Sequence, residues 1–509
     1  MKSGRLMWIA AIAVCAMPTS VVPLNGQDMQ APKHDHKHTH YQLIDLGTLG
    51  GAQSTVIVGS RFLNDHGTVV GCADTSTPDP NYPNFNPFLM DSPFPFGADP
   101  FIFHTFKFEG DSVTDLGSLS GANSSCLGFL TAGGVIVGGS ENGLIDPLTG
   151  LPAMEAVLWQ NGQITNLGTF GGNGSFAIGA NDRGQVVGAA ANTVPDPFSI
   201  FFGWGTQTRA FLWTQSQGLQ DLGTLGGPDA FAGNINDRGQ IFGVSYTSDV
   251  PNPFTGIPTV DAFLYEKGKM TDIPDGFGGT LVSPLGVNNH GELVGNASFA
   301  GDVTSAPFLW SKGEFINLGT FGGTFGDAVS INDAGVITGH AGTPDSAVHG
   351  FLWKKGVLTD IGTVDGDDCS EGWSINSANQ IVGRSFACDG SVAHAFLWEN
   401  GKIFDLNSLI SDGSDLQLIV AGNINNNGEI AGIGVLPSGD QHAFLLVPCD
   451  SKHHGVEGCD YSMVEASATA SVEPTIHATS GTPGRRLPIA LWQRRNRFHF
   501  PRPVIGQTN

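Results

Sequence analysis

Aspartates are the residues of this sequence with the widest choice of chemistry. Asp365, Asp367 and Asp368 lie close together beside Cys369, and other aspartates such as Asp333 recur in Asn-Asp pairs along the chain. A positioned carboxylate can transfer a proton during hydrolysis or elimination, and a group of carboxylates can bind calcium. Because a catalytic group is needed once and the pairs recur, we interpret the pairs as turns. For the three clustered aspartates two interpretations stand, a structural calcium site and a plain acidic turn.

Signatures of other reactions are missing from the sequence. It has no nucleophile elbow, no His-Glu-x-x-His motif and no phosphate-binding glycine loop followed by lysine. It also lacks the Cys-x-x-Cys pairs of a zinc site. His34, His36, His38 and His40 alternate like a metal-scavenging tract, but we interpret them as a polar spacer. Apart from the calcium interpretation, we expect no cofactor.

Four further histidines each begin a similar aromatic segment, namely His104, His349, His394 and His442. Each belongs to a different copy of a longer repeat. We therefore expect their rings to lie apart and to cap a strand within their own copy.

The elements that position these residues follow from a repeat with three blocks. The first block reads Asp/Asn-Leu-Gly-Thr-Leu-Gly-Gly, the second Ile-Asn-Asp-x-Gly-x-x-x-Gly, and the third is clearest in His394–Trp398. The first block starts, at spacings of 43 to 70 residues, at Asp45, Asp115, Asn166, Asp221, Asp272, Asn317, Asp360 and Asp405. Copies two and five depart most, since Leu130–Gly134 lacks the Asn-Asp pair and Asp272–Gly276 lacks the Leu-Gly pair.

Short apolar runs bounded by Gly, Asn and Asp predict four antiparallel strands in each copy. Units of about 40–45 residues with four strands are typical of β-propeller blades. The repeat region opens with a lone fourth strand, Tyr41–Gly47, and closes with a third strand, Ala443–Val447. We therefore predict an all-β, eight-bladed propeller whose N-terminal strand completes the last blade and leaves no open edge. Seven blades is the alternative.

The combination of DLGTLGG, INDRGQ and HAFLW resembles the HAF repeat of extracellular bacterial repeat proteins, over about residues 41–447. The resemblance implies an exported protein with a repeat architecture. It implies no catalytic residue and no ligand.

The segments that flank the repeats differ from them in composition. In residues 1–27, Lys2 and Arg5 precede the apolar run Leu6–Met17, as in a signal peptide, and the run is too short to span a membrane comfortably. Residues 28–40 form a His-rich linker, and residues 448–509 form a tail that we expect to be disordered and that is rich in Arg after residue 484. We expect a secreted or periplasmic monomer with no transmembrane segment after signal removal.

Six cysteines remain beyond the signal peptide, and an exported protein can oxidise them. They fall into three local pairs, Cys72 with Cys126, Cys369 with Cys388, and Cys449 with Cys459. The sequence therefore predicts three disulfides.

The net charge of −24 is unevenly distributed. Residues 41–447 hold 40 acidic residues and 12 Lys or Arg, a balance of −28, whereas the segment after Glu473 holds six Arg and no acid. The acidic repeat region argues against nucleic acid as a partner. The basic tail either stays solvated or contacts an anionic cell surface.

Long insertions interrupt the first four copies between the second and third blocks. The gap is 33 residues from Gly71 to His104, but 10 residues from Gly339 to His349. The insertions are rich in Pro and aromatic residues, which gives ligand-binding candidates Phe85, Phe88, Phe94, Phe96, Phe198, Phe202, Trp204 and Phe254. These side chains either form an exposed rim that binds a ligand or pack on one another as a small satellite core.

Three hypotheses for function follow. The first is a secreted, non-enzymatic propeller that binds carbohydrate or another extracellular protein through the insertions. The second is an extracellular polysaccharide hydrolase or lyase that uses acids at the mouth of the central channel, such as Asp229, Asp327 or Asp365. The third is a structural envelope protein without a discrete ligand.

Overall fold

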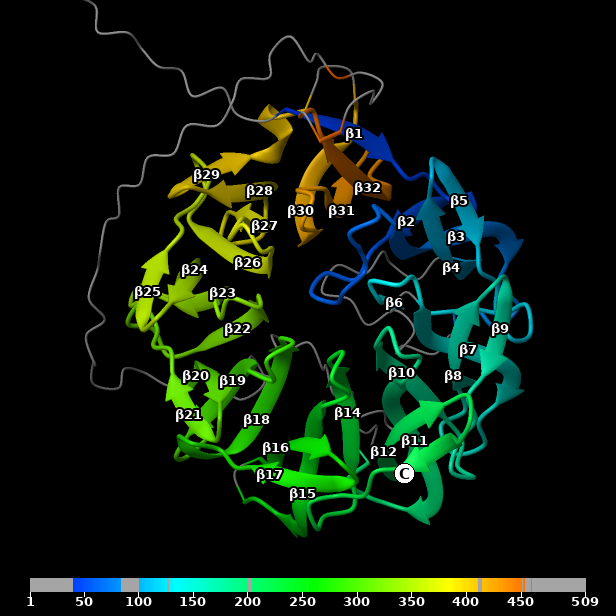
Figure 1. Cartoon of the computed structure of the whole chain (residues 1–509). Coiled ribbons are helices and arrows are strands. Elements are labelled where there is room, and N and C mark those ends of the chain that lie inside the picture. Colours follow the sequence, from blue (N-terminus) through cyan, green and yellow to red (C-terminus); the bar gives the residue numbers. More distant parts are fainter. Residues whose placement is uncertain are drawn as a thin grey trace, which may run out of the picture. The chain divides into compact units, whose positions relative to one another are not determined.

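A computed structural model of the chain describes residues 40–83, 100–125, 128–199, 204–253, 255–410, 414–450, 452–453 and 459. The chain divides into two units, residues 1–38 and 39–509, and every described residue belongs to the second. That unit is built from short antiparallel strands arranged as the blades of a propeller (Figure 1). The all-β prediction is confirmed.

The described strands form eight four-stranded blades. The first strands lie towards the centre in Figure 1 and are β2 (Gly50–Thr55), β6 (Phe129–Leu130), β10 (Ser175–Ala180), β14 (Ala230–Ile235), β18 (Gly278–Val287), β22 (Gly326–Ile331), β26 (Cys369–Ile375) and β30 (Gln417–Ile424). The second strands are β3 (Val69–Pro78), β7 (Ile136–Ile145), β11 (Val186–Pro195), β15 (Ile241–Pro251), β19 (Leu293–Phe299), β23 (Ile337–Gly342), β27 (Ile381–Phe386) and β31 (Ile430–Val435).

The third strands carry the aromatic blocks and are β4 (Phe101–Glu109), β8 (Pro152–Gln160), β12 (Thr206–Thr214), β16 (Pro258–Glu266), β20 (Ser305–Ser311), β24 (Val348–Lys354), β28 (Ala393–Glu399) and β32 (Gln441–Pro448). The fourth strands are β5 (Ser112–Asp115), β9 (Gln163–Asn166), β13 (Gly218–Asp221), β17 (Lys269–Ile273), β21 (Glu314–Asn317), β25 (Val357–Asp360), β29 (Lys402–Asp405) and β1 (Tyr41–Asp45). Blades are numbered 1 to 8 in the order of their first strands, and a single 3-10 turn, η2 (Leu406–Ser408), follows β29 among the described residues.

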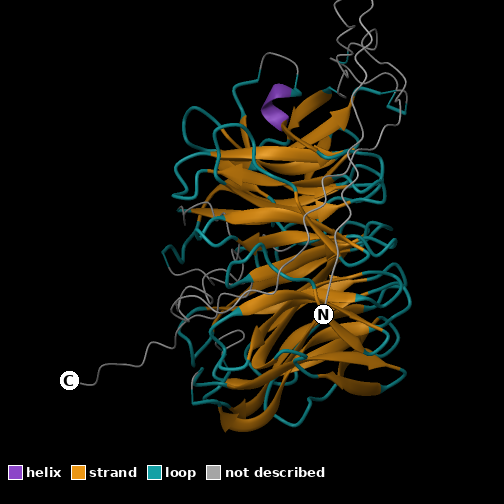
Figure 2. Ribbon diagram, turned by 90° about the vertical axis from the view of Figure 1, so that its left-hand side faces the viewer, coloured by secondary structure: helices purple, strands orange, loops and turns teal. Residues whose placement is uncertain are grey.

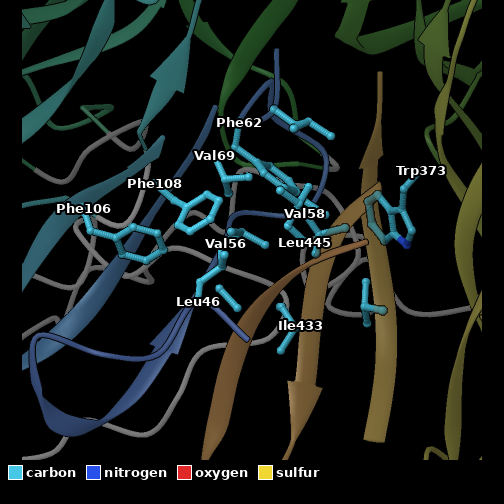
Figure 3. Close-up of a cluster of buried hydrophobic side chains, with 14 of the residues drawn as sticks. Leu46, Val56, Val58, Phe62, Val69, Phe106, Phe108, Trp373, Ile433 and Leu445 are labelled. Atoms are coloured by element: carbon cyan, nitrogen blue, oxygen red, sulfur yellow. The ribbon is translucent and has the colours of Figure 1, made fainter. Parts of the chain in front are cut away.

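The N-terminal strand completes the last blade, as predicted. β1 pairs antiparallel with β32, with Tyr41 opposite Pro448 and Asp45 opposite Phe444, in a sheet with β31 and β30. A buried cluster joins this blade to blade 1, with Leu445 and Ile433 on one side and Phe62 and Phe106 on the other (Figure 3). The first and last blades are thus in contact through their cores.

The two divergent copies still form blades. In copy two, β6 has only two residues, Phe129 and Leu130. In copy five, β18 is long and forms one parallel bridge, Leu281 with Val260 of β16, which joins blades 4 and 5 into a single eight-stranded sheet. The loss of a motif therefore changes a blade without removing it.

Seven of the eight blades pair a second-strand glycine with a third-strand phenylalanine, and blade 2 pairs Gly138 with Val157. In blade 7, Gly383 of β27 pairs with Phe396 of β28, which is fully buried. A Cβ atom on Gly383 would lie 1.9 Å from the carbonyl oxygen of Glu371 and 2.8 Å from the Phe396 ring. The last Gly of the second block is thus required to let the aromatic block pack against the sheet.

The strands run between two faces that carry the loops (Figure 2). We call one the turn face; it carries the Asn-Asp turns between first and second strands, such as residues 332–335, and the turns between third and fourth strands. We call the other the insertion face; it carries the loops between second and third strands and those between blades.

The Asn of each Asn-Asp pair makes two kinds of hydrogen bond. Within its own turn, Asn332 Oδ1 accepts from the backbone N–H groups of Ala334 and Val336, each at 3.0 Å. Its Nδ2 donates to the backbone oxygen of Asn376, the equivalent residue of the next blade, at 2.9 Å. The same bond between blades starts from Asn181, Asn236, Asn288, Asn376 and Asn425, and the last of these donates to Asn64 of blade 1.

The neighbouring Asp or Asn adds a second link at the surface. Asp65 Oδ1 accepts from the backbone N–H of Asn426 at 2.9 Å, and Asp333 Oδ1 accepts from that of Asn289 at 2.9 Å. In blade 2, where Thr131 replaces the Asn, this second link remains, since Asp182 accepts from Gly133 at 2.7 Å. The Asn-Asp pairs therefore form turns, as predicted, and also join the blades.

No helix in the described part of the chain is long and apolar enough to cross a membrane.

We predict that Asn332→Ala lowers the free energy of unfolding by about 2–3 kcal/mol, because backbone groups of the buried residues Val336 and Asn376 and of the exposed Ala334 lose their partner. Asp333→Ala removes two exposed bonds from Asn289 that water can replace, and should cost less than about 1 kcal/mol. Urea denaturation of both variants measures the difference. Equal losses would show that the buried amide has no special role.

Candidate binding face

The insertions of blades 1–4 extend the second and third strands beyond the blade. β3, β7 and β11 have 10 residues and β15 has 11, whereas the second strands of blades 5–8 have six or seven. In blade 3, pairing with β12 resumes at Pro195 and Thr206 after a shift in register. The insertions are therefore hairpins that rise from half of the insertion face.

An Asp or Asn organises the tip of each hairpin. Asp146 Oδ1 accepts from the N–H of Leu148 at 3.0 Å, and Asp196 Oδ1 accepts from that of Phe198 at 2.9 Å. Asp79 makes the same bond to Asn81, and Asn252 stands at the equivalent place in blade 4. This side chain shapes the turn that follows it.

Aliphatic side chains are exposed along these hairpins. Among the described residues nine large hydrophobic side chains are exposed, and six of them lie on the insertions: Tyr82, Leu144, Ile145, Leu148, Val194 and Val250. We call these six residues the apolar ridge. Leu144, Val194 and Val250 each precede the tip Asp or Asn by two residues and are 66%, 47% and 66% exposed. The same exposed position is thus repeated in three neighbouring blades.

The aromatic candidates do not form this ridge within the described chain. Trp204 is only 3% exposed and belongs to a buried cluster with Phe176 and Tyr246, against which Phe198 packs. Both rings therefore belong to the core beneath the insertions, which agrees with the satellite-core interpretation. Phe85, Phe88, Phe94, Phe96, Phe202 and Phe254 lie outside the described residues.

The insertions are acidic. Between the second-strand Gly and the third strand they carry aspartates and glutamates such as Asp79, Asp249 and Glu141, and one base, Arg209, stands at the end of the third insertion. The Nε atom of Arg209 lies 3.0 Å from Asp221 of the same blade, so its charge is already paired. A partner for this face must therefore tolerate negative charge.

Polar pairs hold the third and fourth strands together at the insertion face. His104, His349 and His442 each bond through Nδ1 to the Asp that ends the fourth strand, namely Asp115, Asp360 and Asp45, at 2.7–3.0 Å. Arg209 and Asp221 occupy the same place in blade 3. His394 instead bonds to Asp367 at 2.9 Å. The prediction that the histidines act within separate blades holds for the first three. A spacing of 11 residues links His104 to Asp115 and His349 to Asp360 and could have identified these two Asp partners, whereas Asp45 lies 397 residues before His442.

In the His442–Asp45 pair the pKa values of both members are shifted. Hydrogen bonding to Asp45 raises the pKa of His442, although burial opposes the shift. Burial acts to raise the pKa of Asp45, but the bonds from His442 and Gly47 outweigh it and lower that pKa. The pair therefore stabilises the fold most between the two pKa values, and loses its effect when either group changes charge.

Blade 4 breaks the pattern, because Asp261 takes the place of the His opposite Asp272. Burial and the neighbouring Asp272 raise the pKa of Asp261 to about 7. Burial and the adjacent Asp302 likewise contribute to raising the pKa of Asp275 to about 6. This part of the insertion face therefore carries carboxyl groups that hold protons close to neutral pH.

A polar pocket lies on the other half of the insertion face, between blades 6 and 7. Its volume is about 430 Å³, and its lining includes Asp345, His349, Asp367, Asp368 and Cys388. Asp367 is bonded to His394 Nδ1, and Asp368 accepts a hydrogen bond from the backbone N–H of Cys388 at 2.6 Å. The clustered aspartates of the calcium interpretation thus point to separate partners, and Asp365 is exposed.

Two of the three predicted disulfides are confirmed, Cys369–Cys388 and Cys449–Cys459. Cys72 is also disulfide-bonded, and Cys126 lies outside the described residues. Among the described residues, one cluster of three side chains of metal-binding type lies close enough together to hold a metal ion, namely Asp368, Cys369 and Cys388. Its two sulfur atoms are already joined in a disulfide.

The acids proposed for catalysis do not converge. Asp229 is fully buried in blade 4, and Asp327 is 5% exposed and lies 3.0 Å from His340 within blade 6. Burial lowers the pKa of His340, but hydrogen bonding to Asp327 and the charge of Glu371 outweigh it and raise that pKa. Asp327 is therefore part of an ion pair in the core, and the structure brings no two of Asp229, Asp327 and Asp365 together in a pocket.

Comparisons with known proteins find solved structures at low similarity and no similar sequence. No family model matches the sequence, and no curated protein matches it. The β-propeller domain of the Trilobed protease from Pyrococcus furiosus is 11% identical with a TM-score of 0.42, over 70% of this chain and 97% of that domain. A puromycin-hydrolysing peptidase of Mycobacterium tuberculosis is 12% identical with a TM-score of 0.38, over 79% and 61% of the two chains. Trypanosoma rangeli sialidase is 10% identical with a TM-score of 0.31, over 80% and 59%. At these values the matches say nothing about ligand or activity.

We predict that Asp261→His flattens the fall in melting temperature between pH 5 and pH 8. In the wild type the pKa of Asp261 is raised in the folded state. Its contribution to folding stability is therefore fully present below the ordinary Asp pKa of about 4 and is lost as the pH rises through about 7. The variant restores a His–Asp pair and should melt about 1–3 °C higher at pH 8. Asp272→Asn removes the other carboxylate of the pair, and should also raise the melting temperature at pH 8 relative to the wild type. Thermal denaturation at both pH values tests this, and an unchanged pH dependence in both variants would contradict it.

Proposed function

We propose that the protein is a secreted, non-enzymatic β-propeller of the HAF-repeat type that binds another extracellular protein through the apolar ridge of blades 1–4. The observation that carries the proposal is the gathering of exposed aliphatic side chains on the insertions of blades 2–4, with the exposed ring of Tyr82 on that of blade 1. A row of exposed apolar side chains on stiff hairpins is typical of a surface that another protein covers.

The kind of side chain favours a protein partner over carbohydrate. Sugars are bound by stacking on flat aromatic rings, whereas the ridge presents Leu, Ile and Val and a single aromatic ring, Tyr82. Trp204, the largest ring among the candidates described, is buried. The acidic insertions favour a partner that is neutral or basic around the apolar contact.

Export is supported by two separate features. The first 27 residues have the composition of a signal peptide. Five of the six remaining cysteines are disulfide-bonded in the described chain, which suits an oxidising compartment.

A double variant tests the proposal. Leu144→Asp with Val250→Asp places charges at two points of the ridge and should weaken binding of the partner by about tenfold or more. Val357→Asp is the matched control, since Val357 is 42% exposed but lies at the start of β25, on the turn face. Binding is measured by cross-linking the purified protein to exported proteins from its own culture medium, followed by titration of the captured partner.

Two results would overturn the proposal. If Val357→Asp weakens capture as much as the double variant does, the ridge is not the contact surface. If a glycan array shows saturable binding that both variants retain, the ligand is carbohydrate and its site lies elsewhere.

A further inference from the structure

The insertions of blades 1–4 are each tied to the following blade by the side chain at the hairpin tip. Asp79 Oδ2 accepts from Asn123 Nδ2 at 2.9 Å, and Asp146 Oδ2 accepts from Asn173 Nδ2 at 2.6 Å. In the fourth hairpin Asn252 donates to Thr280 Oγ1 at 3.0 Å. Each of these contacts joins a donor to an acceptor.

The contact between blades 3 and 4 is different, because it joins two carboxyl groups. Asp196 at the tip of the blade 3 hairpin interacts directly with Asp229, which precedes β14. Both residues are buried, at 7% and 0% exposure, and the Oδ2 atom of each receives no hydrogen bond from a donor. Two ionised carboxylates cannot be held in this way without water or a counter-charge.

The repeat itself supplies the comparison, because Asp229 and Asn123 occupy equivalent places. Asp229 Oδ1 accepts from the N–H of Thr208 at 2.7 Å, as Asn123 Oδ1 accepts from that of Phe103 at 3.0 Å. Their backbone oxygens accept from the second-strand residues Tyr246 and Glu141, at 2.9 and 3.0 Å. An amide donor in one blade interface is thus replaced by a carboxyl group in another.

The groups that face the pair do not neutralise it. Arg209 of β12 is bonded to Asp221, and Tyr246 of β15 donates its hydroxyl to the backbone oxygen of Phe198 at 3.2 Å. Burial, with the neighbouring Asp196, raises the pKa of Asp229 to about 9, and burial raises the pKa of Tyr246 as well. A hydrogen bond between the carboxyl groups therefore needs a proton on one of them.

We propose that Asp196 and Asp229 share one proton, and that this proton closes a latch between the blade 3 hairpin and blade 4. Loss of the proton leaves two buried negative charges, which repel each other and release the hairpin. Val194 of the apolar ridge lies two residues before Asp196, so the latch controls whether the ridge is continuous across blades 3 and 4. This consequence for binding rests on the proposed function, whereas the latch itself does not.

Hydrogen exchange of the full chain tests the latch without any partner. The closed form binds one proton more than the open form between the ordinary Asp pKa of about 4 and the raised value of about 9. Protection factors of amides in residues 186–199, corrected for the intrinsic pH dependence of exchange, should therefore fall about tenfold per pH unit from pH 6 to pH 9. Asp229→Asn supplies the amide found at Asn123 and should give protection that does not change with pH.

The reverse substitution tests whether buried carboxyl groups at this position are sufficient. Asn123→Asp places a carboxyl group beside Asp79 and also beside the buried Glu141, whose Oε2 accepts from Asn123 Nδ2 at 3.3 Å, and should make the protection of residues 101–109 fall with pH while residues 186–199 behave as in the wild type. This variant keeps the shape of the side chain, and melting temperatures at pH 5 show whether each variant is folded.

Three outcomes would overturn the latch. If the protection of residues 186–199 falls equally with pH in the wild type and in Asp229→Asn, the pair does not hold the proton. A flat profile in the wild type would show that the hairpin does not open through it. Restoration of protection at pH 9 by millimolar Ca²⁺, in the wild type but not in Asp229→Asn, would show that a cation joins the carboxylates instead of a proton.

The link to binding is tested separately. Capture of the partner should weaken from pH 6 to pH 9 for the wild type and stay constant for Asp229→Asn. If the exchange slopes are as expected and capture by both proteins is equal at every pH, the latch stands and its control of the ridge is wrong. If neither protein captures a partner at any pH, the proposed function fails while the latch is unaffected.

Discussion

The hydrogen bond from a buried asparagine side chain to the next blade is the interaction on which the rest of the structure depends. One amide performs two tasks, since its oxygen shapes the turn and its Nδ2 group binds the equivalent residue one blade further on. The covalent connection between two blades does not by itself fix the angle between their sheets. A bond that recurs at the same atom in successive blades sets that angle each time, and the bond from Asn425 to Asn64 applies it between the last blade and the first.

The two faces of the propeller are consequently free to differ. The turn face holds the bonds between blades in short turns that tolerate little variation, whereas the insertion face carries loops that can lengthen without disturbing them. Among the described residues, blades 1–4 use this freedom for long hairpins that carry six exposed apolar side chains, whereas the short loops of blades 5 and 7 carry one each, Val303 and Val392. The hairpins still need anchoring, and the Asp or Asn at each tip provides it through a contact with the next blade. Departures from these repeated contacts, such as Asp229 and Asp261, are where a property specific to one blade can arise.

Local signals predicted much of this correctly. The Gly, Asn and Asp positions identified the turns, the apolar runs identified the strands, and the out-of-phase ends indicated that β1 would complete the last blade. The candidate site was predicted less well. The length of the insertions identifies them in the sequence, but an aromatic ring does not identify their exposed residues, since Trp204 is buried whereas Leu144 and Val250 are exposed. Composition shows that a hairpin is rich in apolar residues, and cannot show which of them face the solvent.

By itself the sequence determined the class of fold, the preferred number of eight blades and two of the three predicted cysteine pairs, because each is encoded by residues that lie close together or by a repeat that can be counted. Only the tertiary structure decided the partners across blades. The acceptor for Asn332 is 44 residues away, and the donor opposite Asp79 is likewise 44 residues away. Hydrogen bonds depend on atoms placed within about 3 Å of each other, and that placement is set by how whole blades pack. For the same reason Asn123 and Asp229 could be recognised as equivalent, and their difference as informative, only after the blades were in place.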